Sequence, residues 1–421
     1  MSLWCVVAAF GAYACMYAFR KPFTAGTYLN PPYHEGYKVW LIMAQVLGYT
    51  ISKFVGIKVI AEMPPKRRAA SLLMLIGTAL LALLLFAVVP PPYSIVCLFL
   101  NGLPLGMVFG LVLGFLEGRR MTEAFMAGLC ASFILADGFT KSVGAGLLAH
   151  GIREAWMPFC AGLVFILPLA GFVWMLRMIP PPNAADVAAR SERVPMTSGE
   201  RSQFLRRHGP GLFGITVAYL VITVLRSMRA DFAPELWTAL GAPVDAGVFT
   251  RSEMIVAFGV LAVTGLVVLV RDNRRAFFMS LWLSLAGVLL IAATLAAREA
   301  GRISPYAYMV LTGCGLYIPY VAVQTTVFER LIALTRDRAN LGYLIYFADA
   351  FGYLGYVAVI VMRNFRGSGP ILPLFHATAW GVVVVSLVAL VLSVCFFGAQ
   401  LRAPANGVAA GIPMEPAGTK G

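Results

Sequence analysis

Residues 69–89 read AASLLMLIGTALLALLLFAVV, an uncharged run between the basic cluster at 66–68 and the prolines at 90–92. A helix of about 20 residues is long enough to cross a hydrocarbon core roughly 30 Å thick. In lipid only helices and closed barrels satisfy the backbone, and barrel strands alternate apolar with polar residues. This uninterrupted run therefore predicts a transmembrane helix.

Eleven more apolar runs of similar length surround this one along the chain. The sequence is 60% hydrophobic and only 12% charged, and a single soluble core does not bury that much apolar surface. We therefore predict an all-α membrane protein with twelve transmembrane helices in the lipid bilayer, at 3–25, 38–61, 69–89, 94–116, 122–148, 155–178, 211–229, 251–270, 276–296, 304–332, 341–362 and 373–400.

The basic residues lie in short clusters between the runs, although the formal net charge is +14. Such clusters do not form the basic stripe of a nucleic-acid-binding face, so we expect no nucleic-acid partner. The more basic links alternate along the chain, at 66–68, 119–120, 180–210, 271–275 and 336–338. The positive-inside rule places these links and both termini in the cytoplasm. We predict a multi-pass protein of the cell inner membrane; a short cytoplasmic leader would be missing, because the first run starts almost at Met1.

One long polar segment, residues 180–210, separates the sixth and seventh runs. It begins with three prolines and contains Asn, Asp, Ser, Glu and several Arg, whereas the C-terminal end is rich in Gly, Pro and Ala. Biased, polar compositions of this kind are typical of linkers and disordered tails. We predict an N-terminal six-helix half at 1–179, a cytoplasmic linker at 180–210, a C-terminal half at 211–401 and a disordered tail at 402–421.

The two halves carry similar short motifs at corresponding places. Glu117 ends the fourth run and Asp137 lies in the fifth, while Glu329 ends the tenth run and Asp349 lies in the eleventh, at the same separation. This pattern predicts a six-plus-six pseudo-repeat, the architecture of the major facilitator superfamily.

Metal and enzyme chemistry have no support in the sequence. The seven cysteines form no C-x-x-C pair and the four histidines are scattered, so we expect no metal site and no cofactor. No pairing of a nucleophile with a base is apparent, and we predict that the protein is not an enzyme. We expect it to act as a monomer.

Charged side chains inside the apolar runs indicate function, because each costs at least about 2.5–3.5 kcal/mol at a helix centre. In the first run Tyr13, Tyr17 and Arg20 share one helix face. Arg20 is either an anion contact in a central cavity or, with Lys21, a side chain that reaches the outer surface. Lys53 lies deeper in the second run, which favours a site there.

The fifth and eleventh runs each carry an aspartate. Asp137 and Lys141 are four residues apart and therefore neighbours on one helix face. This pair either only neutralises itself or is split by a substrate or a proton. Asp349 shares a helix face with Tyr353, and it is either a proton carrier or the partner of a basic residue across the bundle.

The seventh run carries Arg226 deep in the membrane, which favours a binding site, and then Arg229 and Asp231, which predict an outer-end pair. Arginine suits phosphate or carboxylate because its planar fork bonds two oxygens at once. A tyrosine-lined cavity with an excess of cations therefore predicts a small anionic substrate; the charged candidates are Arg20, Lys53, Lys141 and Arg226 against Asp137 and Asp349.

Short motifs around these residues occur on four of the predicted helices. They comprise Tyr17, Arg20, Lys21 and Phe23 on the first helix, Ser52, Lys53 and Phe54 on the second, Leu225, Arg226, Asp231 and Pro234 on the seventh, and Gly352, Tyr353, Leu354 and Gly355 on the eleventh. In these motifs the sequence resembles the organophosphate:phosphate antiporters of the major facilitator superfamily, which transport glycerol 3-phosphate and hexose phosphates.

The resemblance implies that Arg20 and Arg226 grip a phosphoryl group from the two halves and that Lys53 assists them. The fifth helix departs from the family pattern, because Lys141 stands where the family has a histidine before Asn-x-Gly-Gly. Asp137 and Asp349 also lie outside that pattern. These departures predict a divergent relative whose cargo is either more anionic or different altogether.

We therefore predict a secondary active transporter of a small organic or phosphorylated anion that works by alternating access, with antiport against phosphate as one mode. One alternative is a proton-coupled symporter or exporter in which Asp137 or Asp349 carries the proton. Another is a transport-inactive membrane sensor of the same fold. Only the proton-coupled alternative requires a pH gradient, so imposed gradients distinguish it.

Overall fold

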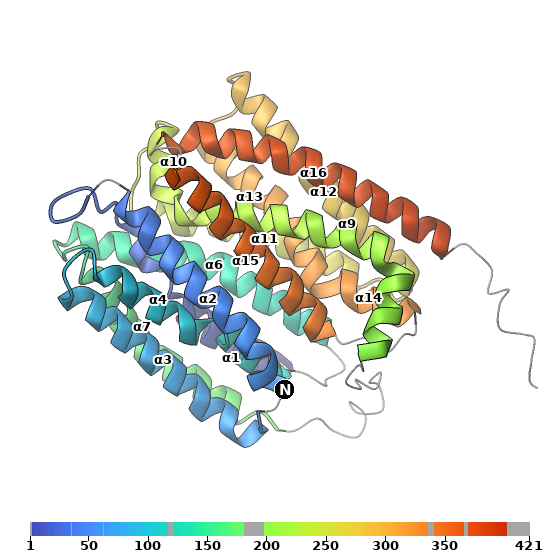
Figure 1. Ribbon diagram of the computed structural model, residues 1–421, viewed down its shortest axis with the longest axis horizontal. Helices are drawn as coiled ribbons and strands as arrows, with labels where there is room; N and C mark the ends of the chain where they lie inside the picture. Colours follow the sequence, from blue (N-terminus) through green and yellow to red (C-terminus); the bar gives the residue numbers. More distant parts are fainter. Residues whose placement is uncertain are drawn as a thin grey trace, which may run out of the picture.

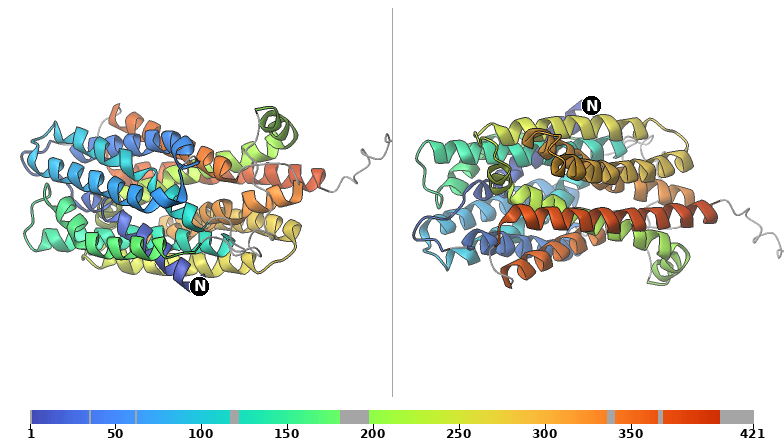
Figure 2. Two further views of the ribbon diagram at one scale, coloured as in Figure 1. Left: turned by 90° about the horizontal axis from the view of Figure 1, so that it is seen from below. Right: turned by 90° about the horizontal axis from the view of Figure 1, so that it is seen from above.

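The computed structural model describes residues 2–34, 36–61, 63–116, 122–180, 198–335, 341–365 and 369–401. Every regular element in these ranges is a helix. In both views of Figure 2 the helices run roughly side by side along the long axis of the molecule. The predicted tail at 402–421 lies outside the described residues.

The helices of the first 180 residues form one side of the bundle, coloured blue to green in Figure 1. They comprise α1 (Ser2–Tyr17), the 3₁₀ turn η1 (Pro22–Ala25), α2 (Tyr37–Ala61), α3 (Pro65–Val88), α4 (Ser94–Leu105), α5 (Val108–Leu116), α6 (Thr122–Ala149) and α7 (Met157–Arg177).

The helices after residue 197 form the other side, coloured green to red in Figure 1. They comprise α9 (Ser198–Asp231), α10 (Ala233–Ala239), α11 (Val248–Val268), α12 (Asn273–Glu299), α13 (Pro305–Ala322), the π-helical turn η2 (Val323–Val327), α14 (Phe328–Thr335), α15 (Leu341–Phe365) and α16 (Ile371–Gln400).

Nine described helices are long and apolar enough to cross a membrane, and two shorter apolar helices lie at 3–17 and 348–362. Helices α4 and α5 together form one such span, and so do α13, η2 and α14. The 28-residue helix α6, which carries Asp137 and Lys141 near its middle, is not among the nine. The chain is thus a multi-pass membrane protein, whereas the count of twelve transmembrane helices stays a prediction.

The first predicted run differs from the structure at its end. The sequence predicts a helix to residue 25, but α1 ends at Tyr17 and a turn precedes η1. Pro22 explains the break, because proline has no N–H to donate and its ring clashes with the preceding helical turn. The carbonyls released near this break find side-chain donors, since Gln45 Nε2 donates to Arg20 O at 2.9 Å and Asn101 Nδ2 to Phe19 O at 3.1 Å.

The predicted linker at 180–210 is also partly different. Residues 181–197 lie outside the described residues, but α9 already begins at Ser198. Packing against the last helix accounts for this early start. The ring of His208 contacts the rings of Phe204 and, on α16, Phe397, and Gln400 Nε2 on α16 donates to Arg207 O at 3.0 Å.

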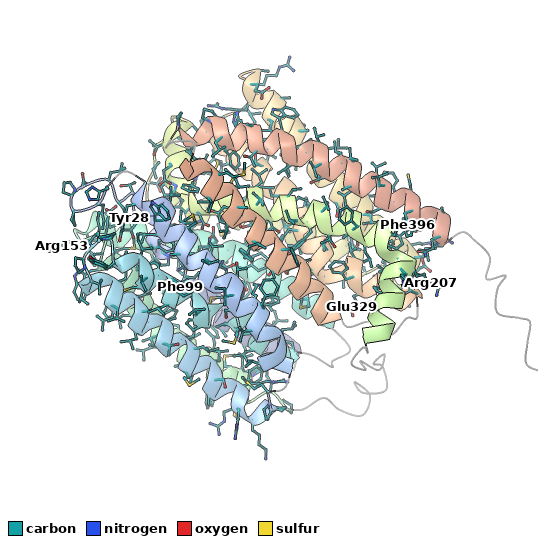
Figure 3. The ribbon with its side chains drawn as sticks, viewed as in Figure 1. Tyr28, Phe99, Arg153, Arg207, Glu329 and Phe396 are labelled. Carbon is teal, nitrogen blue, oxygen red and sulfur yellow. The ribbon has the colours of Figure 1, made fainter. Side chains whose placement is uncertain are left out.

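The two sides meet along α6 with α11 and along α2 with α15. The first of these contacts is backbone-close at Gly138, where an added Cβ would lie 2.4 Å from the carbonyl oxygen of Phe249. Tyr28 and Arg153 lie at one end of the bundle, and Arg207 and Glu329 lie at the opposite end (Figure 3). The membrane side that each end faces stays a prediction.

Candidate functional site

A small cavity lies between the two sides, where the chain leaves α1 and where α9 ends. All of its lining side chains are buried, and they are Tyr17, Arg20, Lys21 and Asp137 from the first side and Arg226, Ser227, Asp231, Tyr317 and Tyr353 from the second. The space open to the centre of a water molecule is about 10 Å³, which is room for roughly one water molecule. The structure therefore shows a closed state of this cavity.

Two arginines face this cavity from opposite sides, and both are surrounded by tyrosine rings. The Cζ atom of Arg20 lies 3.8 Å from the ring centroid of Tyr49, and the Cζ atom of Arg226 lies 4.4 Å from that of Tyr320. Such cation–π contacts stabilise a buried guanidinium without neutralising its charge.

Tyr353 on α15 contacts both arginines. Its ring centroid lies 5.5 Å from Arg20 Cζ and 5.9 Å from Arg226 Cζ. Its hydroxyl accepts a hydrogen bond from Arg226 Nη2 at 3.2 Å. One tyrosine thus links the two cations, one from each side of the bundle.

Neither arginine has a carboxylate at ion-pair distance among the described residues. The Nε atoms of Arg20 and Arg226 are also buried without a hydrogen-bond partner in this part of the chain. Because a buried charge is costly unless it is paired and hydrogen-bonded, these two groups require a compensating anion.

The other buried cations in the described ranges differ in this respect. Seven lysine and arginine side chains are buried there, and five of them have a carboxylate partner: Lys21 with Asp231, Lys38 with Glu235, Lys53 with Asp349, Lys141 with Asp137 and Arg229 with Glu253. Seven cations against five carboxylates leave two positive charges, and these belong to Arg20 and Arg226.

Three of these ion pairs join the two sides of the bundle. Lys21 follows α1 and binds Asp231 at the end of α9, while Lys53 on α2 binds Asp349 on α15. Near one end, Lys38 Nζ lies 2.6 Å from Glu235 Oε1 on α10. The two sides cannot separate at these positions without breaking or exchanging buried ion pairs.

Asp349 has a dense set of partners in addition to Lys53. Tyr219 Oη donates to Asp349 Oδ1 at 2.9 Å and Tyr320 Oη donates to the same oxygen at 3.2 Å. Gln324 Nε2 in turn lies 2.7 Å and 3.0 Å from these two hydroxyls. Gln324 belongs to the π-helical turn η2, and single π-helical turns occur often at functional sites.

The structure places the predicted site residues in two groups. Arg20, Arg226, Tyr17, Tyr353 and Asp137 line the cavity. The remaining candidates lie behind the lining: Lys53 and Asp349 bind each other, Lys141 binds Asp137 at 2.5 Å, and Tyr13 packs edge-on against Tyr17 and Phe109.

Two of the alternatives considered for the sequence are wrong. Arg20 and Lys21 do not reach an outer surface, because both are buried between the helices. Arg229 and Asp231 do not pair with each other. Arg229 Nη2 lies 2.8 Å from Glu253 on α11 instead, since residues two apart on a helix point in different directions.

Sequence reasoning missed Ser227, Tyr317 and the cavity position of Asp231. Ser227 directly follows Arg226, and its position beside this candidate residue was the signal that could have identified it. Tyr317 lies on α13, two residues before Pro319 inside that helix. Nothing in the sequence pairs Asp231 with Lys21, which is 210 residues away.

Comparison with known proteins identifies the fold and the family. The structure is similar to the crystal structure of a D-xylose-proton symporter, with a TM-score of 0.60, 14% sequence identity, and coverage of 93% of this chain and 97% of the symporter. This likeness shows that the chain shares the fold of that symporter. No curated protein sequence matches the chain. A family model covers residues 22–400, and the chain therefore belongs to the family of unknown function DUF5690.

Proposed function

We propose that the protein is a secondary transporter that carries a small, doubly charged oxyanion across the membrane by alternating access. The observation that carries this proposal is the pair of buried arginines without carboxylate partners, Arg20 and Arg226. A ligand with two negative charges between them would neutralise both cations. The seven buried cations and their five carboxylate partners in the described ranges leave an excess of two positive charges, which matches one doubly charged substrate.

Arginine chemistry supports an oxyanion rather than a simple halide. A planar guanidinium offers two parallel N–H donors to phosphate or carboxylate, and the unpartnered Nε atoms of both arginines leave one member of each fork available. The tyrosine rings around them exclude water and lower the local dielectric, which strengthens each charge-assisted hydrogen bond.

The arrangement also supports a coupling of binding to movement. Arg20 and Arg226 belong to opposite sides of the bundle, so a ligand held by both stabilises the closed state more than an open one. A ligand shifts a conformational equilibrium only through such a difference in affinity. Buried side chains from both sides enclose the cavity in this state, and substrate entry therefore requires the two sides to separate, as two six-helix halves would in alternating access.

The test uses purified protein in proteoliposomes, with inorganic phosphate and small organic phosphates as probes. Exchange of labelled phosphate against internal phosphate should be measurable. Arg20→Lys and Arg226→Lys should insert normally and lose about 100-fold or more in binding, because lysine cannot reproduce the bidentate fork. The matched control is Arg251→Lys at an exposed ion pair with Asp245. Normal binding and exchange by both Arg20→Lys and Arg226→Lys would refute the proposal.

A second candidate is a proton-coupled transporter in which Asp349 is protonated during the cycle. The observation in its favour is that Asp349 bridges the two sides through Lys53 and also accepts hydrogen bonds from Tyr219 and Tyr320. Protonation would release this bridge. An imposed pH gradient separates the candidates, because accumulation driven by that gradient requires proton coupling, whereas exchange does not. Binding of the probes without any flux would instead indicate a membrane sensor.

A further inference from the structure

Within the described residues, the cavity contains an unpartnered hydrogen-bond acceptor as well as the two arginine cations. Four of its lining residues have a buried polar atom without a hydrogen-bond partner in the described chain: Arg20 Nε, Arg226 Nε, Ser227 Oγ and Asp137 Oδ1. The first two donate, and the serine hydroxyl can donate or accept. Asp137 Oδ1 can only accept while the carboxylate is charged.

The carboxylate of Asp137 is held so that one oxygen remains available. Its Oδ2 atom accepts a hydrogen bond from Lys141 Nζ at 2.5 Å. Its Oδ1 atom lies 3.8 Å from Lys21 Nζ, which is too long for a hydrogen bond. Lys21 donates to Asp231 instead, and the second oxygen of Asp231 accepts from Tyr356 Oη at 2.9 Å. Asp137 Oδ1 is therefore the acceptor that the cavity offers to a ligand.

The surrounding charges decide which kind of donor fits this oxygen. Lys21, Lys141, Asp137 and Asp231 form a connected cluster with two positive and two negative charges. A further full cation beside Asp137 would face two lysines in a cluster that is already neutral. A neutral O–H group satisfies the oxygen without adding charge.

From these contacts we infer that the substrate carries its own hydroxyl donor, which binds Asp137 Oδ1 while the oxyanion binds the two arginines. This inference deepens the proposed function and rests on it. The ligand class is a doubly charged oxyanion with an O–H group. A dianion without such a proton would place a bare oxygen against the carboxylate or leave Asp137 Oδ1 unsatisfied.

Two sources could supply the O–H group. It belongs to the oxyanion itself in hydrogen phosphate, and it belongs to the organic part in a hydroxylated phosphate ester. The recognising chemistry is the same in both cases, and suitable probes separate them. Sulfate has the shape and charge of hydrogen phosphate but no proton, and methyl phosphate has no hydroxyl whereas 2-hydroxyethyl phosphate does.

The experiment measures binding of these four probes to the full-length protein in detergent by calorimetry. At about pH 8 phosphate and its esters are largely dianions, like sulfate. We expect phosphate to bind about 10- to 100-fold more tightly than sulfate, which is the range expected for one unsatisfied buried acceptor. If the donor lies in the organic part, 2-hydroxyethyl phosphate should exceed methyl phosphate by a similar factor.

The wild-type results alone distinguish a failure of the hydroxyl inference from a failure of the proposed function. Binding of sulfate within about threefold of phosphate, together with equal binding of the two esters, would overturn the inference and leave the anion site intact. Failure of all four probes to bind would overturn the proposed function and the inference together. Discrimination in either pair supports the inference and names the source of the hydroxyl.

The variant test assigns the discrimination to Asp137. Asp137→Asn combined with Lys141→Met removes one charge of each sign, so the cluster stays neutral and folding is protected. The amide can donate a hydrogen bond where the carboxylate could not, and sulfate should gain affinity until the preference falls to about threefold or less. Ser227→Ala is the matched control, because its hydroxyl serves either role and its loss should weaken both anions equally. A double variant that keeps the wild-type preference would refute the role of Asp137.

Discussion

The buried pair of Lys53 and Asp349 offers a quantitative test of the interior. Lys53→Met removes the cation but leaves Asp349 with hydrogen bonds from Tyr219 and Tyr320. Removing one member of a buried ion pair typically costs about 3–5 kcal/mol, because the remaining charge is uncompensated. The two tyrosine hydroxyls still donate to the carboxylate and compensate part of its charge. We therefore expect a loss near the low end of the range, about 3 kcal/mol.

The double variant Lys53→Met with Asp349→Asn should recover most of that loss. Asparagine keeps an oxygen in position to accept from Tyr219 and Tyr320 and no longer carries a charge. We expect the double variant to be about 2 kcal/mol more stable than Lys53→Met alone. The assay is reversible unfolding in mixed micelles with increasing denaturant, followed by tryptophan fluorescence.

Additive losses in this double-mutant cycle would refute the reasoning, because independent effects mean that the two charges do not interact. The pair also joins α2 to α15 across the bundle. A cysteine placed at Ser227, which lines the cavity, should therefore react faster with a water-soluble thiol reagent in Lys53→Met than in the double variant. Equal rates would contradict a role of the ion pair in holding the cavity closed.

Three further predictions concern other parts of the molecule. Asp137→Asn should cost about 3 kcal/mol because it leaves Lys141 unpaired at the middle of α6, and Lys141→Met should restore about 2 kcal/mol, as measured by unfolding; additive losses would contradict the pair. Gly138→Ala should cost about 1–3 kcal/mol because its Cβ would overlap the backbone of α11, whereas Gly146→Ala on the same helix has open space and should be neutral or slightly stabilising. Topology reporters fused at position 193 and at the C-terminus should both report the cytoplasm, and an outside signal from either would overturn the predicted orientation.

Much of the fold could be predicted because a membrane constrains the backbone so strongly. An uncharged run such as 69–89 must become a helix in lipid, and α3 covers almost the same residues, Pro65–Val88. The boundaries that were missed depend on other interactions. The first run breaks at Pro22 with help from Gln45 and Asn101, and α9 begins early because it packs against α16.

The candidate site was predictable to the extent that a single helix determines it. Spacing alone places Asp137 beside Lys141, because residues four apart share a helix face, and the structure shows this pair at 2.5 Å. The cost of a charge in the bilayer singles out Arg20 and Arg226 in the same way, and both line the cavity. The four-residue spacing and the presence of a charge in an apolar run are both properties of a single helix, so they can be read from the sequence alone.

Only the tertiary structure decided which buried charged side chains pair with each other. Lys53 and Asp349 are 296 residues apart, and Lys21 and Asp231 are 210 apart. Helices that are apolar on nearly every face, such as α16, carry little information about their neighbours. The packing of α2 against α15, and the contact between the turn after α1 and the end of α9, neutralise both lysines. Arg20 and Arg226 remain as the buried cations without a carboxylate in the described chain. Charge balance is a property of the assembled bundle, because an ion pair forms only where packing brings its two members within a few ångströms.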